Sequence, residues 1–306
     1  MFEVVFLGTS ASAPSLTRSL PSTMVLYGRH RFLIDCGEGT QQQLLKSGLG
    51  FKRLNHILLT HGHLDHILGL GGLVSTFSRW EAIDRLEIYG GAWALERVRD
   101  LILGVVLRGA RPNLQIEFIE ISPGAILEDE HFSLSAFPVT HKGPGCFGYT
   151  FEEKSRRPFL TAVAERLGVP PGPERRRLVR GEPITLADGR VVSPDEVLGA
   201  PISGARLVYV GDASRVDDLV DEAKEADALV IESTYLQAEA HLAKKYSHLT
   251  AAQAATLARE ARVKMLYLTH ISRRYSGEEV LAEAQSIFPR TVVVRDLDRA
   301  QVVKER

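Results

Sequence analysis

The residues best suited to chemistry lie in one stretch, Thr60–Leu70, which reads THGHLDHILGL. It holds four potential metal ligands within six residues, namely His61, His63, Asp65 and His66. In an extended segment alternate side chains share one side, so His61 and His63 can bind one ion. If the chain then turns, Asp65 and His66 can reach a second ion. Imidazole nitrogen and carboxylate oxygen suit zinc or a similar divalent ion.

A polar loop that merely contains histidines is the alternative interpretation of this stretch. Against it stands the local density, because three of the ten histidines of the chain lie within six residues. The three residues before the stretch, 57–59, are apolar and predict a strand, and the residues 67–77 predict a helix beyond it.

Three further candidate ligands occupy the same kind of position as His61, because each directly follows an apolar, β-rich run. They are His141, Asp212 and His270. Loops at strand ends gather along one rim of an α/β sheet, so we expect all these side chains to meet there. Each distal residue taken alone is equally consistent with a core or capping role.

Together the candidates predict a two-metal site. We expect one ion to be bound by His61, His63 and His141, a second by Asp65, His66 and His270, and both to be bridged by Asp212. Two divalent ions about 3.5–4 Å apart can activate a water and stabilise the attacking and leaving oxygens of a phosphoryl group. The predicted chemistry is therefore hydrolysis.

The elements that position these residues alternate between strand and helix, which predicts a layered α/β fold. Strands are expected at 2–7, 23–27, 31–34, 57–59, 86–89, 114–121, 132–140, 146–151, 206–210, 228–231, 265–268 and 292–294. Helices are expected at 41–46, 67–77, 92–103, 216–226, 237–245 and 251–261. Thr250 is a natural N-cap for the last of these helices. We expect 292–294 to be the last strand, followed by a charged tail.

Composition sets limits on the class of protein. The chain has 306 residues, 44% of them hydrophobic, enough for one large domain or two closely joined halves. Its formal charge of −1 does not favour a nucleic-acid partner globally, so any such surface must be local. Cys36 and Cys146 lack CxxC spacing, which fits a reducing, cytoplasmic location. No signal peptide and no membrane span are expected.

One segment, 152–201, departs from this pattern and divides the domain into a first half, 1–151, and a second half, 202–306. It shows little apolar periodicity, and six prolines precede Pro201. Between Lys154 and Arg180 there are eight basic residues and two acidic ones. A solvated face is the ordinary explanation of such a run, and a local basic binding surface is the other.

These motifs resemble a known family. His61–His66 reads HGHLDH and matches the HxHxDH signature of metallo-β-lactamase-fold hydrolases. With GTSASAP, FLIDCGEGTQQQLL, VTH, YVGDAS, HLT and LTHISRRY, the chain is similar nearly end to end to the ribonuclease Z family of tRNA 3′-end endonucleases. Gly172–Gly181 resembles the G-P-x4-L-x2-G pattern of the arm with which that family grips tRNA. Many members have HLHGDH where this chain has HGHLDH, which keeps every ligand. Many also have HST where this chain has His248-Leu249-Thr250, which keeps the histidine but lacks the middle hydroxyl.

The resemblance implies a fold, a reaction and partners. The fold is a four-layer αββα sandwich with an inserted flexible arm. The reaction is removal of the 3′ trailer from precursor tRNA, which leaves a 3′-hydroxyl on the tRNA and a 5′-phosphate on the trailer. Two Zn²⁺ per subunit are implied, with Mn²⁺ or another divalent ion as a substitute. A homodimer is implied, and no DNA partner is expected.

The resemblance also implies roles for individual residues. Asp65 would accept a proton from the attacking water besides touching a metal, and His248 would be the general acid for the leaving oxygen. Glu232 would orient His248, although a structural salt bridge is equally consistent with its position. Asp35 is either a cap or a support for the histidine loop. Contacts with RNA would come from Arg175, Arg176, Arg177, Arg180, Arg273 and Arg274.

Two other functions remain compatible with these residues. A metallo-β-lactamase-fold hydrolase of a small ester, lactone or thioester would use the same metals but has no need of a basic arm. A non-catalytic RNA-binding protein is possible if the metals are structural, but it would not need Asp65 and His248.

Overall fold

The computed structural model describes residues 1–81, 83–110 and 113–304, and the chain divides into two compact units. The first, which we call the main domain, comprises Met1–Glu152 and Ala205–Arg306. The second, which we call the arm unit, comprises Glu153–Gly204. Within the described residues, no helix is both long and apolar enough to cross a membrane.

Two seven-stranded sheets form the centre of the main domain as far as the structure describes it. The first sheet has the order β16-β1-β2-β3-β4-β5-β6. Its strands are β1 (Phe2–Gly8), β2 (Ser22–Tyr27), β3 (His30–Ile34), β4 (His56–Leu58), β5 (Arg85–Gly90), β6 (Gln115–Glu120) and β16 (Arg299–Val302). Pairing is antiparallel from β16 to β3 and parallel from β3 to β6.

The second sheet has the order β15-β14-β13-β12-β9-β8-β7. Its strands are β7 (Gly124–Glu128), β8 (Phe132–Pro138), β9 (Phe147–Glu153), β12 (Arg206–Tyr209), β13 (Ala228–Glu232), β14 (Leu266–Thr269) and β15 (Thr291–Val293). The pairs from β12 to β15 are parallel. The carboxyl ends of these four strands therefore lie along one rim, where loops can build a site.

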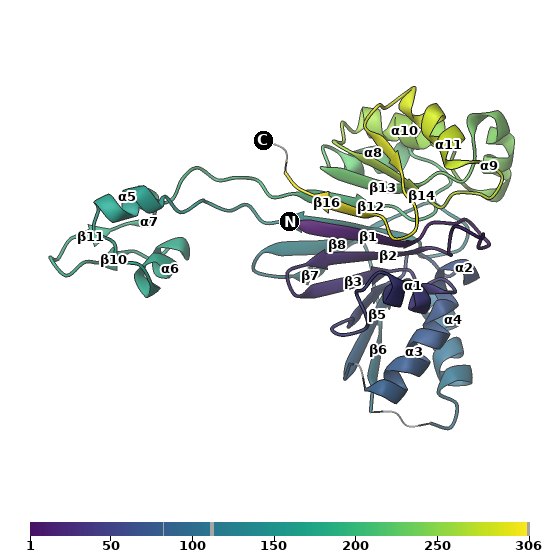
Figure 1. Ribbon diagram of the computed structural model, residues 1–306, viewed down its shortest axis with the longest axis horizontal. Coiled ribbons are helices and arrows are strands. Elements are labelled where there is room, and N and C mark those ends of the chain that lie inside the picture. The colour runs from purple at the N-terminus through teal and green to yellow at the C-terminus, as the bar shows by residue number, and fades with distance from the viewer. Residues whose placement is uncertain (82, 111–112, 305–306) are drawn as a thin grey trace. The chain divides into compact units, whose positions relative to one another are not determined.

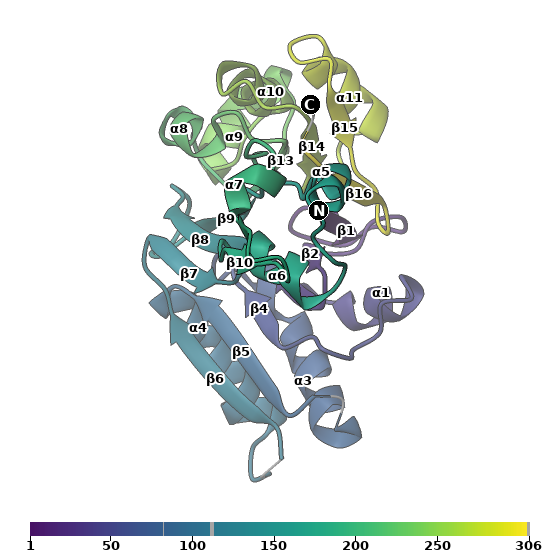
Figure 2. The ribbon, with the colours of Figure 1, turned by 90° about the vertical axis from the view of Figure 1, so that its left-hand side faces the viewer.

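Helices cover the outer face of each sheet (Figure 1). The first sheet carries α1 (Thr40–Lys46), α2 (Leu64–Ile67), α3 (Gly69–Trp80) and α4 (Ala92–Arg99), which continues as a π-helical segment, Asp100–Val106. The second carries α8 (Val220–Ala223), α9 (Ala240–Tyr246), α10 (Ala251–Glu260) and α11 (Gly277–Gln285), with 3₁₀ turns at Asp217–Leu219 and Gln237–Glu239. Figure 2 shows the green and yellow helices on one side of the strands and α1 and α3 on the other.

The layering follows from strands that are apolar on both faces. In β1, Phe2, Val4 and Phe6 belong to the core between the two sheets. The alternate residues Val5 and Leu7 belong to the core beneath the helices of the first sheet. A third core joins the second sheet to α8, α10 and α11. These three cores give four layers and confirm the predicted αββα sandwich.

The arm unit has more regular structure than the sequence pattern predicted. It contains α5 (Thr161–Arg166), α6 (Pro173–Val179), a hairpin of β10 (Ile184–Thr185) and β11 (Val191–Val192), and α7 (Pro194–Val197). A small core of its own holds them together, with Leu178 and Val197 fully buried. Each element is at most seven residues long, too short to show a period in the sequence.

The G-P-x4-L-x2-G pattern has a structural explanation within this unit. Gly172 and Gly181 have φ values of 125° and 87°, which side chains rarely adopt, and Pro173 begins α6. Leu178 points into the small core. The pattern therefore marks the helix and turns of α6.

Several expected boundaries were wrong. The segment 292–294 is not the last strand, because β16 pairs antiparallel with β1 at the sheet edge. Strand β7 and helix α11 were not predicted, and the helix expected over 216–226 is reduced to a 3₁₀ turn and one turn of α-helix. Charged residues in β16 and the short length of α8 weaken the apolar period in each case. Thr250 does cap α10, as predicted, in a capping box with Gln253.

Candidate metal centre and active site

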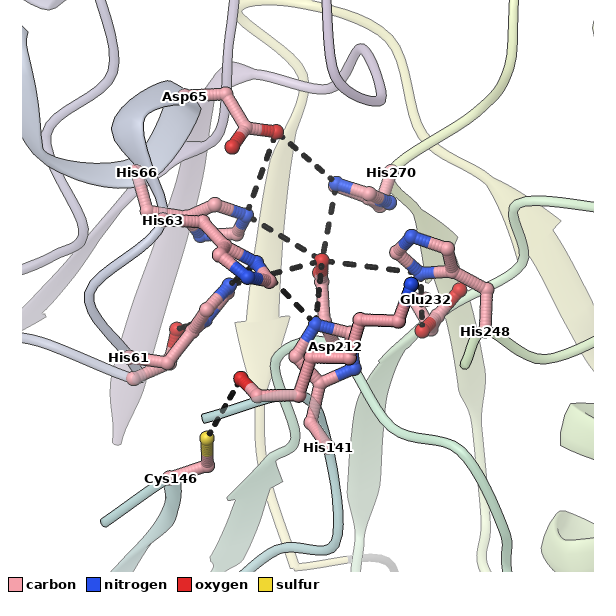
Figure 3. A network of polar contacts seen from close by, with 12 residues as sticks. His61, His63, Asp65, His66, His141, Cys146, Asp212, Glu232, His248 and His270 are labelled. Atoms are coloured by element: carbon pink, nitrogen blue, oxygen red, sulfur yellow. Dashed lines mark hydrogen bonds and ion pairs between the residues drawn. The ribbon is translucent and has the colours of Figure 1, made fainter. Parts of the chain in front are cut away.

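The strand ends deliver the candidate ligands to one place (Figure 3). His61, His141 and Asp212 each lie three residues beyond the end of a strand, β4, β8 and β12 respectively. His270 directly follows β14, and its φ of 56° turns the chain immediately at the strand end. The single turn of α2 carries both Asp65 and His66. Positions scattered over more than two hundred residues of sequence thus converge.

Within the described residues, potential ligand atoms form three overlapping groups, each within 4.8 Å. The first is His61, His63, His141 and Asp212, the second is Asp65, His66 and His270, and the third is Asp212, His248 and His270. In the first, Nδ1 of His63 lies 2.8 Å from Nε2 of His61 and 3.3 Å from Nε2 of His141. In the second, Oδ2 of Asp65 lies 3.8 Å from Nε2 of His66 and 3.7 Å from Nε2 of His270.

Asp212 lies between the first two groups, at the centre of the contacts drawn in Figure 3. Its Oδ2 is 3.8 Å from Nε2 of His141 and 3.5 Å from Nε2 of His66, and its Oδ1 is 3.4 Å from Nε2 of His270. A buried carboxylate that faces both groups has the position required of a bridging ligand.

Three of the imidazoles, those of His66, His141 and His270, each have a partner on the side away from the cluster. His66 donates from Nδ1 to Oδ2 of Asp35 at 2.7 Å, and His141 donates from Nδ1 to the carbonyl oxygen of Ser247 at 2.8 Å. Nδ1 of His270 lies 2.8 Å from the hydroxyl of Thr234. Protonation of Nδ1 leaves the lone pair on Nε2, the atom that faces the cluster.

Asp35 supports the histidine loop. Besides binding His66, its carboxylate accepts hydrogen bonds from the backbone N–H and the hydroxyl of Thr60, at 2.8 and 2.7 Å. Asp35 is fully buried, and the N-cap of α1 is Gly39, which has no side chain to cap the helix. The sequence left open whether Asp35 caps a helix or supports the histidine loop, and the structure favours support of the loop.

The chemistry of these residues fits a divalent metal site. Nε2 of His66 and Nε2 of His270 are buried and have no hydrogen-bond partner among the described residues, a costly arrangement for polar atoms. Burial lowers the pKa of His61 and His141, and that of His63 to about 4, which keeps three imidazoles neutral as ligands must be. The nitrogen and oxygen donors suit zinc.

The electrostatics of the second group differ, because the surrounding carboxylates favour positive charge near His66. Burial opposes a charge on His66, yet the carboxylates of Asp212, Asp35 and Asp65 raise its pKa well above the usual value. Burial likewise opposes ionisation of Asp65, but His66 and His270 lower the pKa of its carboxyl well below the usual range. Three carboxylates around one buried imidazole make a site that a cation would neutralise.

His248 is bound differently from the candidate ligands. Its Nδ1 lies 2.9 Å from Oε1 of Glu232, and its side chain is 12% exposed. Burial would lower the pKa of His248, but the Glu232 carboxylate raises it to about 9. The ring lies near Asp212 and His270, within reach of a metal, but the Nδ1 proton is directed at Glu232. His248 thus differs from the candidate ligands in that its Nδ1 proton binds a carboxylate while its ring lines the cleft.

Glu232 is a fully buried carboxylate that binds four donors. Besides His248, it accepts hydrogen bonds from the backbone N–H groups of Ala213 and Leu249, at 2.8 and 3.2 Å, and from the hydroxyl of Thr234. It thereby links the loops that carry Asp212, His248 and His270. The sequence placed Glu232 correctly at a strand end but contained no sign of these backbone contacts.

The centre opens into a cleft of about 620 Å³, large enough for a small ligand or one or two nucleotides. Besides the candidate ligands and His248, its walls include the cationic residues Arg97, Lys142 and Arg274 and the aromatic residues Tyr235 and Tyr246. A second hollow, of about 580 Å³, shares Arg274 and Tyr235 and adds Arg273. Cations and aromatic rings suit the phosphates and bases of single-stranded RNA.

Sequence reasoning missed several of these wall residues. Lys142 directly follows His141 and Tyr246 lies two residues before His248, and this closeness in the chain was the only signal. Ser12, in the small-residue loop after β1, donates its backbone N–H to Oδ2 of Asp65 at 3.1 Å. Thr60 and Thr234 were also missed, because their contacts with Asp35 and His270 join residues 25 and 36 positions apart in the sequence.

The arginines predicted to bind RNA differ from one another. Arg176, Arg177 and Arg180 of the arm unit are exposed, although Arg177 is paired with Glu182 at 3.1 Å. Arg175 is packed within the unit, where it donates from Nη2 to the Val169 carbonyl oxygen at 3.1 Å and lies over the ring of Phe159. Arg175 is thus placed to stabilise the arm unit itself.

Two sheets between helices, with a His/Asp cluster at the strand ends, define the metallo-β-lactamase fold and indicate a divalent metal site. The family model described as "Beta-lactamase superfamily domain" matches residues 30–202 and 179–271. YhfI from Bacillus subtilis, a metallo-β-lactamase-fold protein, has a TM-score of 0.70 at 18% identity over 98% of both chains. That likeness concerns the fold alone.

Within that class, the chain belongs to the ribonuclease Z family. It is 46% identical to Ribonuclease Z of Bradyrhizobium sp. (strain ORS 278) over 302 residues, which cover 99% of this chain and 100% of the relative. Identity to Ribonuclease Z of Listeria monocytogenes serotype 4b (strain F2365) is 41%, over 96% of this chain and 97% of the relative. The short form of human tRNase Z has a TM-score of 0.68 at 26% identity, covering 98% of this chain and 99% of that one. The predicted resemblance is confirmed.

Proposed function

We propose that this protein is an endoribonuclease that removes the 3′ trailer from precursor tRNA, leaving a 3′-hydroxyl on the tRNA and a 5′-phosphate on the trailer. The observation that carries the proposal is the His248–Glu232 pair, which stands beside the candidate metal ligands in a cleft with cationic and aromatic walls. Full-length relatives named Ribonuclease Z support it.

The reaction would use two divalent ions, zinc by preference. His61, His63 and His141 would hold one ion, Asp65, His66 and His270 the other, and Asp212 would contact both. When bound, such ions make a water acidic enough to attack and neutralise charge on the phosphate.

The chain itself supplies the proton transfers. Asp65, whose carboxyl stays ionised because His66 and His270 lower its pKa against the effect of burial, is the acceptor for the proton of the attacking water. His248 donates a proton to the 3′ oxygen that leaves phosphorus, and the Glu232 carboxylate keeps the imidazole charged and oriented. Arg274, which is exposed at the cleft, is suited to a phosphate near the cut.

Recognition of the tRNA body would fall to the arm unit. Arg176, Arg177 and Arg180 are exposed there, and arginines make sequence-independent phosphate contacts. Such contacts read the shape of a folded RNA, so the arm unit should govern affinity more than turnover. We further propose that the protein is a homodimer, which rests on the family. We also propose a cytoplasmic location, which fits the two buried cysteines that form no disulfide.

The decisive experiment is cleavage of a precursor tRNA labelled at both ends, with and without chelator, followed by mapping of the new 3′ end. We expect a tRNA with a 3′-hydroxyl and a trailer with a 5′-phosphate, both lost with chelator and restored by Zn²⁺. Cleavage that persists in chelator, or a 3′-phosphate on the tRNA, would contradict the proposal. Parallel assays on lactones and thioesters test the small-molecule alternative.

A further inference from the structure

The most informative feature outside the proposed machinery is Tyr246, the last residue of α9. Its side chain is 42% exposed, although tyrosine is large and partly apolar, and it lines the same cleft as His248 and Asp212. Exposed aromatic rings at the edge of a phosphate-binding site are suited to stacking on a nucleobase.

Two cations accompany this ring. Nζ of Lys142 lies 5.6 Å from the centre of the Tyr246 ring, and Nζ of Lys245 lies 5.3 Å from it. Both lysines are exposed. The two ammonium groups lie over the ring, but both belong to exposed side chains, so a base can stack on the ring once they move aside to its neighbouring phosphates.

The backbone fixes Tyr246 relative to His248. Ser247 adopts the left-handed conformation with φ of 65°, and the N–H of His248 returns to the carbonyl oxygen of Ala243 at 2.9 Å. The carbonyl oxygen of Ser247 accepts the Nδ1 proton of His141 at 2.8 Å. The segment Tyr246–His248 is therefore anchored to both α9 and the candidate metal centre.

The direction of the reaction decides which nucleotide meets the ring. In the proposed hydrolysis, the water oxygen forms a bond to phosphorus, the bond from phosphorus to the 3′ oxygen breaks, and that oxygen takes a proton from His248. The 3′ oxygen belongs to the nucleotide upstream of the cut. His248 must therefore stand beside the upstream nucleotide, and Tyr246 lines the same cleft two residues before His248 in the chain.

We propose that Tyr246 is the stacking surface for the base immediately upstream of the cut, the base that becomes the new 3′ end. This inference rests on the proposed function. Stacking accepts every base, so Tyr246 would fix the position of the cut strand without demanding a particular nucleotide. It would bring the 3′ oxygen to His248 with Lys142 beside the adjacent phosphate.

Tyr235 and Trp93 are also aromatic residues near the centre. The Tyr235 ring lies 6.3 Å from that of His248, but Tyr235 is only 9% exposed and leaves little surface for a base. The contacts of Trp93 make it a structural residue. Its ring packs edge-on against His63 at 5.6 Å, and the guanidinium of Arg97 covers it at 5.4 Å. A Cβ added to Gly143 would come within 2.5 Å of the same ring. Trp93 is thus half-buried and packed against His63, whereas Tyr246 is 42% exposed.

The test couples an enzyme variant to a substrate that lacks one base. Precursor tRNA is assembled with an abasic ribose at the nucleotide upstream of the cut, or at the first nucleotide of the trailer. The kcat/KM of the wild type, Tyr246→Ala and Tyr246→Phe is measured on each substrate. Trp80→Ala is the matched control, because Trp80 is a 67% exposed aromatic residue that is not among those lining the cleft.

We expect Tyr246→Ala to lower kcat/KM on the normal precursor by about tenfold to a hundredfold, the usual worth of one stacked base. The upstream abasic substrate should cost the wild type a similar factor and Tyr246→Ala nothing further. Tyr246→Phe and Trp80→Ala should both behave as the wild type. Because the ratio of two substrates is taken within one variant, partial loss of folded protein cancels.

Two results would overturn the inference. One is independence, in which the losses from Tyr246→Ala and from the upstream abasic site multiply. The other is a result in which Tyr246→Ala removes the effect of the abasic site at the first trailer nucleotide instead, which would place the ring beside the trailer. Failure of the wild type to cleave the normal precursor would instead overturn the proposed function, and the stacking role with it.

Discussion

Nδ1 of His248 lies 2.9 Å from Oε1 of Glu232, a carboxylate that is fully buried at the end of β13. The pair joins a ring in the cleft to a group that also binds the backbone at Ala213 and Leu249. A single carboxylate therefore holds the candidate acid in place and links it to the loop that carries Asp212.

Glu232→Gln should lower precursor cleavage by about a hundredfold, because the amide can occupy the same space but cannot hold an imidazolium by charge. The measurement is single-turnover cleavage of precursor tRNA. Glu278→Gln, the same change at an exposed position in α11, is the control and should leave the rate unchanged. Full activity of Glu232→Gln would contradict the orienting role.

His248→Ala separates a proton donor from a metal ligand. We expect cleavage to fall by about 10²–10⁴-fold, the usual contribution of a general acid, with the bound metal per chain unchanged. His141→Ala is the matched histidine and should lose metal as well as activity. Mass spectrometric metal analysis of both purified variants checks this. Loss of metal from His248→Ala would make His248 a ligand.

Asp35→Asn tests the support of the histidine loop. The carboxylate binds both His66 and Thr60, so its neutralisation should weaken metal affinity by about tenfold to a hundredfold. Titration of metal-free protein with Zn²⁺ measures the effect. Asp188→Asn, at an exposed turn of the arm unit, supplies the comparison. An unchanged affinity for Asp35→Asn would show that His66 needs no such partner.

The arm arginines should divide into two classes. Replacing Arg176, Arg177 and Arg180 together by alanine should weaken binding of precursor tRNA. The same change should flatten the salt dependence of binding by about one unit of slope for each phosphate that is no longer neutralised. Hydrolysis of bis(p-nitrophenyl) phosphate should not change, since that substrate has no tRNA body. Equal loss of activity on both substrates would show that these arginines do more than hold RNA.

Arg175→Ala, in contrast, removes a packed side chain and should destabilise the arm unit by about 1–3 kcal/mol. Hydrogen exchange of residues 159–200 measures that destabilisation. Unchanged protection of this segment in Arg175→Ala would show that the packing of the side chain does not stabilise the unit.

The sequence alone predicted the candidate ligands and the strands that precede His61, His141, Asp212 and His270, because a polar residue after an apolar run is a local pattern. It also determined the four layers through the family motifs. Short elements such as α6, β7 and β16 were missed or misplaced, since a period needs more residues than they contain.

Only the tertiary structure decided which neighbours complete the site. Asp212 lies close to the candidate ligands of both predicted groups. Asp35 binds His66 across 31 residues of sequence, and Glu232 binds His248 across 16. Arg175, one of three adjacent arginines, packs inward while the next two face solvent. Such contacts depend on which loops meet at the rim of the sheet, and no local spacing encodes that meeting.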